Sequence, residues 1–257
     1  MCDLGSGHRA LLVLDFDWTV INSNSDTDVV EAFATNIDEC RARLREAGSA
    51  RAWTNGMNTE MGMLHDKGTT VQEIEEYLMS IKIERELSDA LKLASASGAI
   101  IHILSDANTW FIDVILRANG LSGTIARVCS NPVEFERGRV RIFPFHTSPH
   151  PDPESTSPPN LCKGRVMEEW LRELQSECKL NTVIYAGDGS GDFEGAMRVP
   201  QGGFILARKD WSLHRSLNAA ADKGQGPQAE TCTWETQVQL AALILVHLGI
   251  STETLGH

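Results

Sequence analysis

Two features that would assign the chain to a broad class are absent from its sequence. The longest apolar run, LAALILVHLGI, covers only residues 240–250, whereas a membrane-spanning helix needs roughly 20 apolar residues. Lysines and arginines form no cluster, and the formal net charge of −12 opposes binding to the phosphates of a nucleic acid. We therefore expect neither a membrane anchor nor a nucleic-acid partner.

Signals of an oxidising compartment are also absent. The six cysteines lie far apart without a C-x-x-C pair, and there is no N-x-S/T glycosylation site. The N-terminal stretch MCDLGSGHRALLVLDFD ends its apolar run in carboxylates, where a secretory signal would carry a small-residue cleavage site. These observations favour a reducing, cytoplasmic location.

What the sequence does contain is an alternation of strand and helix patterns. Short apolar runs at 10–16, 99–105, 181–188 and 202–207 alternate with helical patterns at 108–120 and 163–179. This order predicts an α/β fold with a Rossmann-like parallel sheet covered by helices on both faces.

Two segments interrupt the alternation. Residues 25–94 are polar, methionine-rich and mostly helical in pattern, which predicts a small helical cap inserted after the first strand. The core would then comprise residues 1–24 and 95–257. Residues 144–160 are rich in proline and serine and are expected to form an exposed loop.

Polar residues gather where the predicted strands end. Asp15 and Asp17 end the first strand, Ser105 and Asp106 the second, and Asp188 the third. Ligands of open parallel sheets bind beyond the carboxyl ends of the strands. We therefore expect these side chains to share one site.

The D-x-D pair of Asp15 and Asp17 has several interpretations. An EF-hand loop is excluded because its sixth position, which needs glycine, is Val20. A nucleotide-sugar transferase uses D-x-D to hold a metal ion, and two aspartates also simply terminate strands. A further interpretation is attack on phosphorus, in which one carboxylate is the nucleophile and the other transfers protons.

Other residues complete the chemistry that such an attack needs. In AGDGSGDFEG, Asp188 would hold a magnesium ion, and Asp192 would orient one of its ligands. Ser105 precedes a helical pattern, where it would bind an anion or cap the helix. Lys163, where a loop enters a helix, would bind a phosphate or remain solvated.

The order D-x-D-x-T, serine, lysine, G-D-x-x-x-D is similar to that of haloacid dehalogenase-type phosphatases. The segments DFDWTVINSNSDTDVV, ILSDANTWFIDVIL and PPNLCKGRVMEEWL further resemble the phosphoethanolamine/phosphocholine phosphatase family, together with its plant relatives that act on pyrophosphate or thiamine monophosphate. The resemblance runs from about Leu11 to about Leu217.

This resemblance implies a magnesium-dependent phosphatase with a Rossmann-like core and a small helical cap. Its substrate would be a small phosphomonoester of the phosphocholine/phosphoethanolamine, pyridoxal phosphate or thiamine monophosphate type. The resemblance implies that Asp15 is the nucleophile, which would form a phosphoaspartate, and that Asp17 is the acid/base. Ser105 and Lys163 would bind the phosphate, and Asp26 and Asp106 would select the substrate's amine. The metal would be bound by Asp15, the Asp17 backbone carbonyl and Asp188, with Asp192 supporting these ligands.

Two alternatives and one departure accompany this interpretation. The chain would otherwise be a pyrophosphate-specific phosphatase of the same fold, or a non-hydrolysing phosphate-binding or signalling protein, although Asp17 opposes storage of a phosphoaspartate. Trp18 stands where relatives carry a polar residue, and its ring would either pack inward or stack on substrate.

Overall fold

The computed structural model describes residues 8–46, 50–148, 159–177 and 179–251, and its centre is a six-stranded parallel sheet. The strand order is β3-β2-β1-β6-β7-β8, so the first strand of the chain is central. These strands are β1 His8–Leu14, β2 Ile100–Asn108, β3 Arg127–Asn131, β6 Lys179–Gly187, β7 Phe204–Arg208 and β8 Glu230–Trp234. The predicted α/β fold with a Rossmann-like parallel sheet is confirmed.

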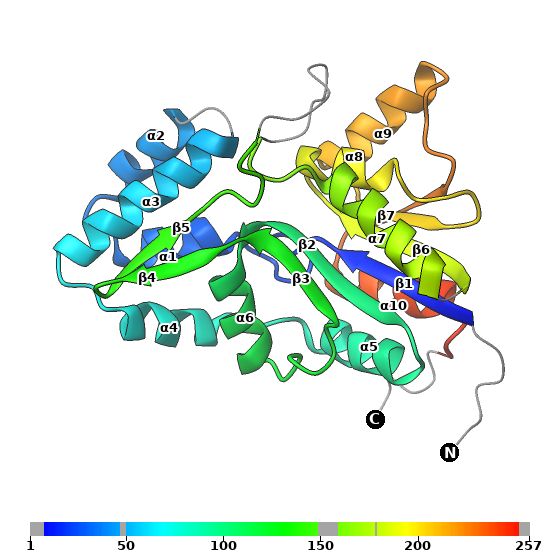
Figure 1. Cartoon of the computed structure of the whole chain (residues 1–257), viewed down its shortest axis with the longest axis horizontal. Helices are drawn as coiled ribbons and strands as arrows, with labels where there is room; N and C mark the ends of the chain where they lie inside the picture. The colour runs from blue at the N-terminus through cyan, green and yellow to red at the C-terminus, as the bar shows by residue number, and fades with distance from the viewer. Residues whose placement is uncertain (1–7, 47–49, 149–158, 178, 252–257) are drawn as a thin grey trace.

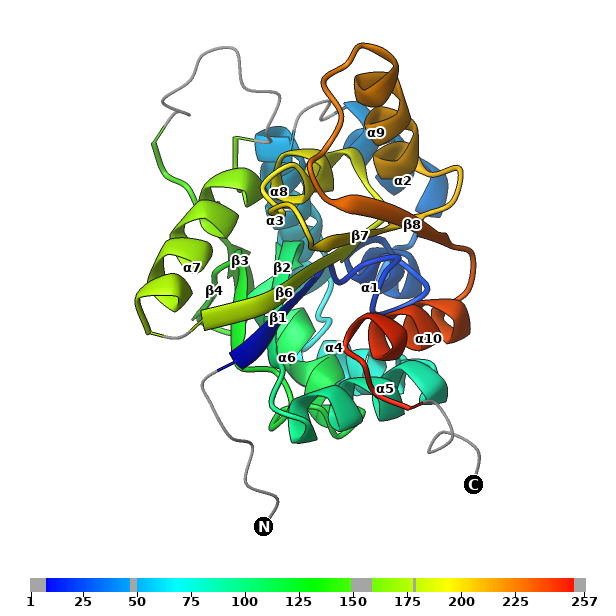
Figure 2. The same ribbon diagram turned by 90° about the vertical axis from the view of Figure 1, so that its right-hand side faces the viewer.

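Helices cover both faces of this sheet (Figure 2). One face carries α7 Lys163–Glu177, α8 Phe193–Ala196 and α9 Ser212–Asp222; the other carries α5 Arg85–Ala96, α6 Thr109–Ala118 and α10 Gln237–His247. Successive β1 side chains enter opposite layers: Leu11 packs with the first set, and Leu12 with the second. Burial on both faces explains why the sequence of this strand is apolar without interruption.

The remaining helices, α1 Ser25–Phe33, α2 Ile37–Glu46, α3 Ala50–Asp66 and α4 Val71–Ser80, come from the segment predicted as a cap. In Figure 1, α2 and α3 lie on the side toward which the β1 arrow points. A second piece of chain joins them, because the hairpin of β4 Val133–Glu136 and β5 Arg139–Ile142 packs against α3. The Asn58 side chain ties the two together, its Oδ1 accepting the Ile142 N–H at 2.7 Å.

The sequence pattern did not predict this hairpin, whose strands are only four residues long. It also assigned α5 to segment 25–94, whereas α5 packs against α10 on a face of the sheet. The boundaries of the cap at 25 and 94 stay a prediction.

Two further expectations concern the periphery. No helix of the described residues has both the length and the apolar composition needed to cross a membrane. The loop expected at 144–160 lies mostly outside the described residues, since 149–158 are not described; residues 144–148 form neither helix nor strand.

Candidate active site

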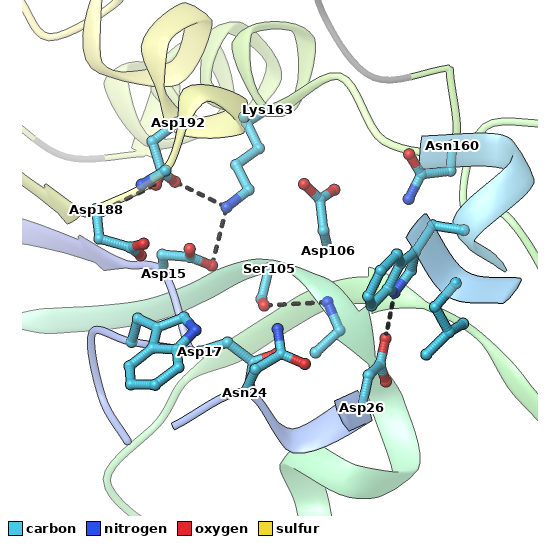
Figure 3. A pocket seen from close by; sticks show the side chains of 16 residues that line it. Asp15, Asp17, Asn24, Asp26, Ser105, Asp106, Asn160, Lys163, Asp188 and Asp192 are labelled. Carbon is cyan, nitrogen blue, oxygen red and sulfur yellow. Dashed lines mark hydrogen bonds and ion pairs between the residues drawn. The ribbon is translucent and has the colours of Figure 1, made fainter. Parts of the chain in front are cut away.

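A cavity of about 460 Å³ lies at the carboxyl edge of the sheet. All eight residues singled out in the sequence line it (Figure 3): Asp15, Asp17, Asp26, Ser105, Asp106, Lys163, Asp188 and Asp192. Parallel strands bring them together, because β1, β2 and β6 are neighbours and end at the same edge. Residues far apart in sequence thus converge on one site.

Lys163 is the cation of this site. Its Nζ lies 2.8 Å from Asp15 Oδ1 and 2.7 Å from Asp192 Oδ1, and the residue is only 2% exposed. Burial acts to lower the pKa of Lys163, but Asp15 and Asp192 outweigh it and raise that pKa well above its usual value. The ammonium is therefore charged and buried, which rules out the solvated lysine considered from the sequence.

Asp192 is held by donors on both oxygens. Besides Lys163, its Oδ1 accepts the Tyr185 hydroxyl at 2.8 Å, and its Oδ2 accepts the backbone N–H groups of Asp188 at 3.1 Å and Gly189 at 2.9 Å. Glycine is required at 187, because a Cβ there would lie 2.5 Å from Asp192 Cγ. This arrangement agrees with a supporting role for Asp192 behind the direct ligands.

Carboxylate oxygens of Asp15, Asp188 and Asp192 lie within 4.8 Å of one another. Burial, followed by repulsion from Asp192, raises the pKa of Asp15 to about 7, although Lys163 acts against it. Burial and the charges of Asp15 and Asp192 raise the pKa of Asp188 to about 8. Thr19 Oγ1 donates to Asp188 at 3.2 Å. Crowded carboxylates are the donor set that a hard divalent cation stabilises, and the raised pKa values of Asp15 and Asp188 reflect this crowding, so the cluster fits magnesium.

Asp17 stands apart from this cluster. A turn after β1, with Val20 N–H donating to Phe16 O at 2.8 Å, redirects the chain, and Asp17 Oδ1 accepts the Ser25 N–H at 3.0 Å. Burial and the charge of Asp26 raise the pKa of Asp17 well above its usual value. A carboxyl group whose pKa is raised holds its proton more firmly than usual, which suits general acid catalysis. Metal binding through the Asp17 backbone carbonyl stays a prediction.

Ser105 is 1% exposed near the end of β2, and its Oγ accepts the Ala107 N–H at 3.2 Å. It does not cap α6, because the N-cap is Asn108, whose side chain accepts the Phe111 N–H at 2.9 Å. Between the two interpretations of Ser105, the structure therefore removes helix capping and leaves its hydroxyl in the cavity.

Two more carboxylates line the cavity, from Asp26 and Asp106; Asp106 lies near Lys163, and Asp26 lies farther from it (Figure 3). Asp26 accepts the Trp53 indole N–H at 2.9 Å and an Asn108 amide N–H at 3.3 Å, while burial raises its pKa to about 6. Asp106 is placed by Asn131, which donates to its backbone oxygen at 2.6 Å. Its Oδ1 is buried and has no hydrogen-bond partner among the described residues.

Sequence reasoning missed several residues of this site. Trp53 and Leu44 come from α3 and α2, and nothing in the cap pattern distinguished them. Tyr185 was visible as the one hydroxyl in the apolar run VIYAG, and Asn160 as the residue before LCK. Trp18 packs on Trp211, with ring centroids 5.4 Å apart, and also lines the cavity. Its position therefore fits both roles considered from the sequence, which were packing within the protein and stacking on substrate.

Comparison with known proteins agrees with this geometry. Residues 10–248 match the family model described as "Putative Phosphatase". Inorganic pyrophosphatase 1 of Arabidopsis thaliana is 33% identical over 204 residues, which cover 77% of this chain and 67% of that protein. The human phosphoethanolamine/phosphocholine phosphatase is 29% identical over 247 residues, covering 93% and 88%.

A solved structure has the same fold. The phospho-aspartyl intermediate analogue of phosphoserine phosphatase superposes with a TM-score of 0.61 at 15% identity, covering 95% of this chain and 100% of that one.

Proposed function

The chain belongs to this phosphatase family and is a phosphatase of the haloacid dehalogenase type that acts on small phosphomonoesters, and we propose that the alcohol portion of its substrate carries a positive charge. Phosphocholine, phosphoethanolamine and thiamine monophosphate are substrates of this kind. A cytoplasmic location and the absence of a nucleic-acid partner belong to the same proposal.

The distribution of charge in the cavity supports this choice. Among the described residues that line it, Lys163 is the one base, and it lies beside Asp15. Asp26 lies at the other end with the Trp53 indole, and Asp106 lies between Asp26 and Lys163. A phosphate held near Lys163 would direct its alcohol toward carboxylates and an aromatic ring, which attract an ammonium group and repel an anion.

The roles of the residues follow from their positions. The Asp15 carboxylate attacks phosphorus, the bond to the alcohol oxygen breaks, and Asp17 donates its proton to that leaving oxygen. Asp17, now ionised, removes a proton from the water that attacks the phosphoaspartate, which releases phosphate and regenerates both carboxyl groups. Ser105 and Lys163 hold the phosphoryl oxygens during both steps.

Asp15 and Asp188 would hold a magnesium ion directly, with Asp192 behind them, since both Asp192 oxygens already accept hydrogen bonds. When bound, magnesium supplies positive charge that offsets the repulsion between the carboxylates and the phosphoryl oxygens. Lys163 stays in place through its contact with Asp192 while Asp15 reacts.

Pyrophosphate is the second candidate substrate, because the relative that is 33% identical is named an inorganic pyrophosphatase. Its leaving group is an anionic phosphate, which would have to lie beside Asp26 and Asp106. Coulomb repulsion disfavours that arrangement in a buried cavity. We therefore rank pyrophosphate below the cationic esters.

The test is phosphate release by the purified protein, with magnesium and with chelator, across phosphocholine, phosphoethanolamine, thiamine monophosphate, pyridoxal phosphate, pyrophosphate and nucleotides. A matched probe is 3,3-dimethylbutyl phosphate, which has the shape of phosphocholine and the same phosphate, but a neutral carbon in place of the cationic nitrogen. We expect magnesium-dependent turnover and a kcat/KM at least about tenfold higher for phosphocholine than for this probe. Equal rates for the two, or a preference for pyrophosphate, would contradict the assignment.

A further inference from the structure

The turn that carries Asp17 contains an unusual backbone conformation. Trp18 has a φ of 59°, in the left-handed region that bulky side chains rarely adopt. Its N–H donates to Ser23 O at 2.9 Å, which closes the loop between Asp17 and α1. Because Trp18 directly follows Asp17, its backbone angles affect where the Asp17 carboxyl points.

Arg208, the last residue of β7, holds this turn from the other side of the site. Its guanidinium donates to Trp18 O at 2.7 Å and to Asn22 Oδ1 at 2.8 Å. Its Cζ lies 4.3 Å from the ring centroid of Trp211, 5.2 Å from that of Trp234 and 5.9 Å from that of Trp18 itself. Three indole rings therefore limit the movement of a guanidinium whose fixed fork is matched to two acceptors.

A second contact supports the same turn. The Gln237 amide at the start of α10 donates to the carbonyl oxygens of Thr19 and Val20, both at 3.2 Å. Arg208 remains the group that bonds the left-handed residue itself. No other cation contacts the Trp18 carbonyl in the part of the chain that the structure describes.

We infer that Arg208 is a positioning residue for proton transfer by Asp17. By fixing the left-handed turn at Trp18, it keeps the Asp17 carboxyl directed at the oxygen of the departing alcohol. The inference rests on the proposed function, since it presupposes that Asp17 donates a proton to that oxygen. Arg208 itself touches no reacting atom in this account.

Two substrates with different leaving groups separate this role from a general structural one. An alkoxide leaving group, as in phosphocholine, needs the proton, whereas the nitrophenolate of p-nitrophenyl phosphate leaves with little help from an acid. In Arg208→Gln we expect kcat/KM to fall about 100-fold for phosphocholine and less than about tenfold for p-nitrophenyl phosphate. Partial loss of folded protein would lower both values equally.

The matched control is Arg215→Gln. Arg215 is exposed on α9, where its guanidinium donates to Asp210 O rather than to the Trp18 turn. We expect this variant to leave both values unchanged. Arg208→Lys, which retains one donor for the Trp18 carbonyl, should recover part of the lost phosphocholine activity and also serves if the glutamine variant does not fold.

A double variant tests the backbone argument directly. Glycine adopts a φ of 59° without steric cost, so the turn should depend less on Arg208 in a Trp18→Gly background. The Arg208→Gln loss for phosphocholine should then shrink at least about threefold. The inference would be overturned if Arg208→Gln lowered kcat/KM equally for the two substrates, or if its loss for phosphocholine were the same with Trp18 as with Gly at position 18. A wild-type protein that hydrolyses neither ester would contradict the proposed function instead.

Discussion

Replacing Lys163 with methionine would remove the only base from the described lining of the cavity. Its ammonium lies 2.8 and 2.7 Å from carboxylate oxygens of Asp15 and Asp192. At an effective dielectric constant of about 20, each pair attracts by about 6 kcal/mol, most of which offsets the cost of burying the charges. Breaking a buried pair by removing one partner typically costs about 3–5 kcal/mol, so we expect Lys163→Met to lower the free energy of unfolding by that amount.

The size of the loss should depend on pH. The pKa of Asp15 is raised to about 7 even with Lys163 beside it, and removing the Lys163 ammonium should raise the pKa of Asp15 further. A carboxyl with a raised pKa in the folded state destabilises the protein as pH increases from its unfolded pKa up to its folded pKa. The wild type completes this loss near pH 7, whereas the variant continues to lose stability, so the difference between them should widen above pH 7.

Urea unfolding in chelator, followed by far-UV circular dichroism at pH 6 and pH 8, measures both effects. The matched control is Lys209→Met, because Lys209 is an exposed lysine paired with Glu235, and the loss of an exposed ion pair should leave the free energy of unfolding nearly unchanged. Added magnesium should restore part of the stability of Lys163→Met, since the same carboxylates would bind it. A loss no larger than that of the control would refute the electrostatic account of this site.

Further predictions concern the nucleophile, the metal, selectivity and acid stability. Asp15→Asn should lower kcat at least about a thousand-fold with an unchanged circular dichroism spectrum, because an amide does not form the phosphoaspartate; retained turnover would exclude it as nucleophile. Magnesium at 100 times its dissociation constant should add about 2.7 kcal/mol of stability and raise Tm by about 5–10 °C, which calorimetry with and without chelator measures. Asp106→Asn should lower kcat/KM about 10- to 100-fold for phosphocholine but less than twofold for 3,3-dimethylbutyl phosphate, and parallel losses would argue against a contact with the substrate cation. Burial lowers the pKa of His102 to about 4, so up to about 2 kcal/mol of stability should be lost as pH falls from about 6.5 to 4, and His102→Phe should flatten the urea midpoint over that range.

The strand ends were the part of this protein most accessible from sequence. The run LLVL is uninterrupted because β1 is buried on both faces, and Asp15 follows directly. Parallel topology then fixes the edge on which Asp15, Ser105 and Asp188 meet, without any knowledge of their contacts. This is why the strand-end residues of the predicted set lie in one cavity, whereas Asp26 was included only because of the family resemblance.

Elements with weak patterns were not accessible in this way. The strands β3 and β8 are short, with sequences RVCSN and ETCTW that lack a regular alternation. The β4–β5 hairpin acquires its place through α3, which lies some 80 residues earlier and bonds it through Asn58. Pairing with a distant partner decides such segments more than local propensity does.

The sequence by itself therefore determined the chemical groups of the site and the edge of the sheet on which they lie. Tertiary structure decided how each group behaves: Lys163 pairs with Asp15 and Asp192, and Asp26 bonds to Trp53. It also brought Arg208 to the Trp18 turn across 190 residues of chain. The physical reason is that a pKa and a hydrogen-bond partner depend on burial and on neighbours in space, and the packing of the whole chain selects those neighbours.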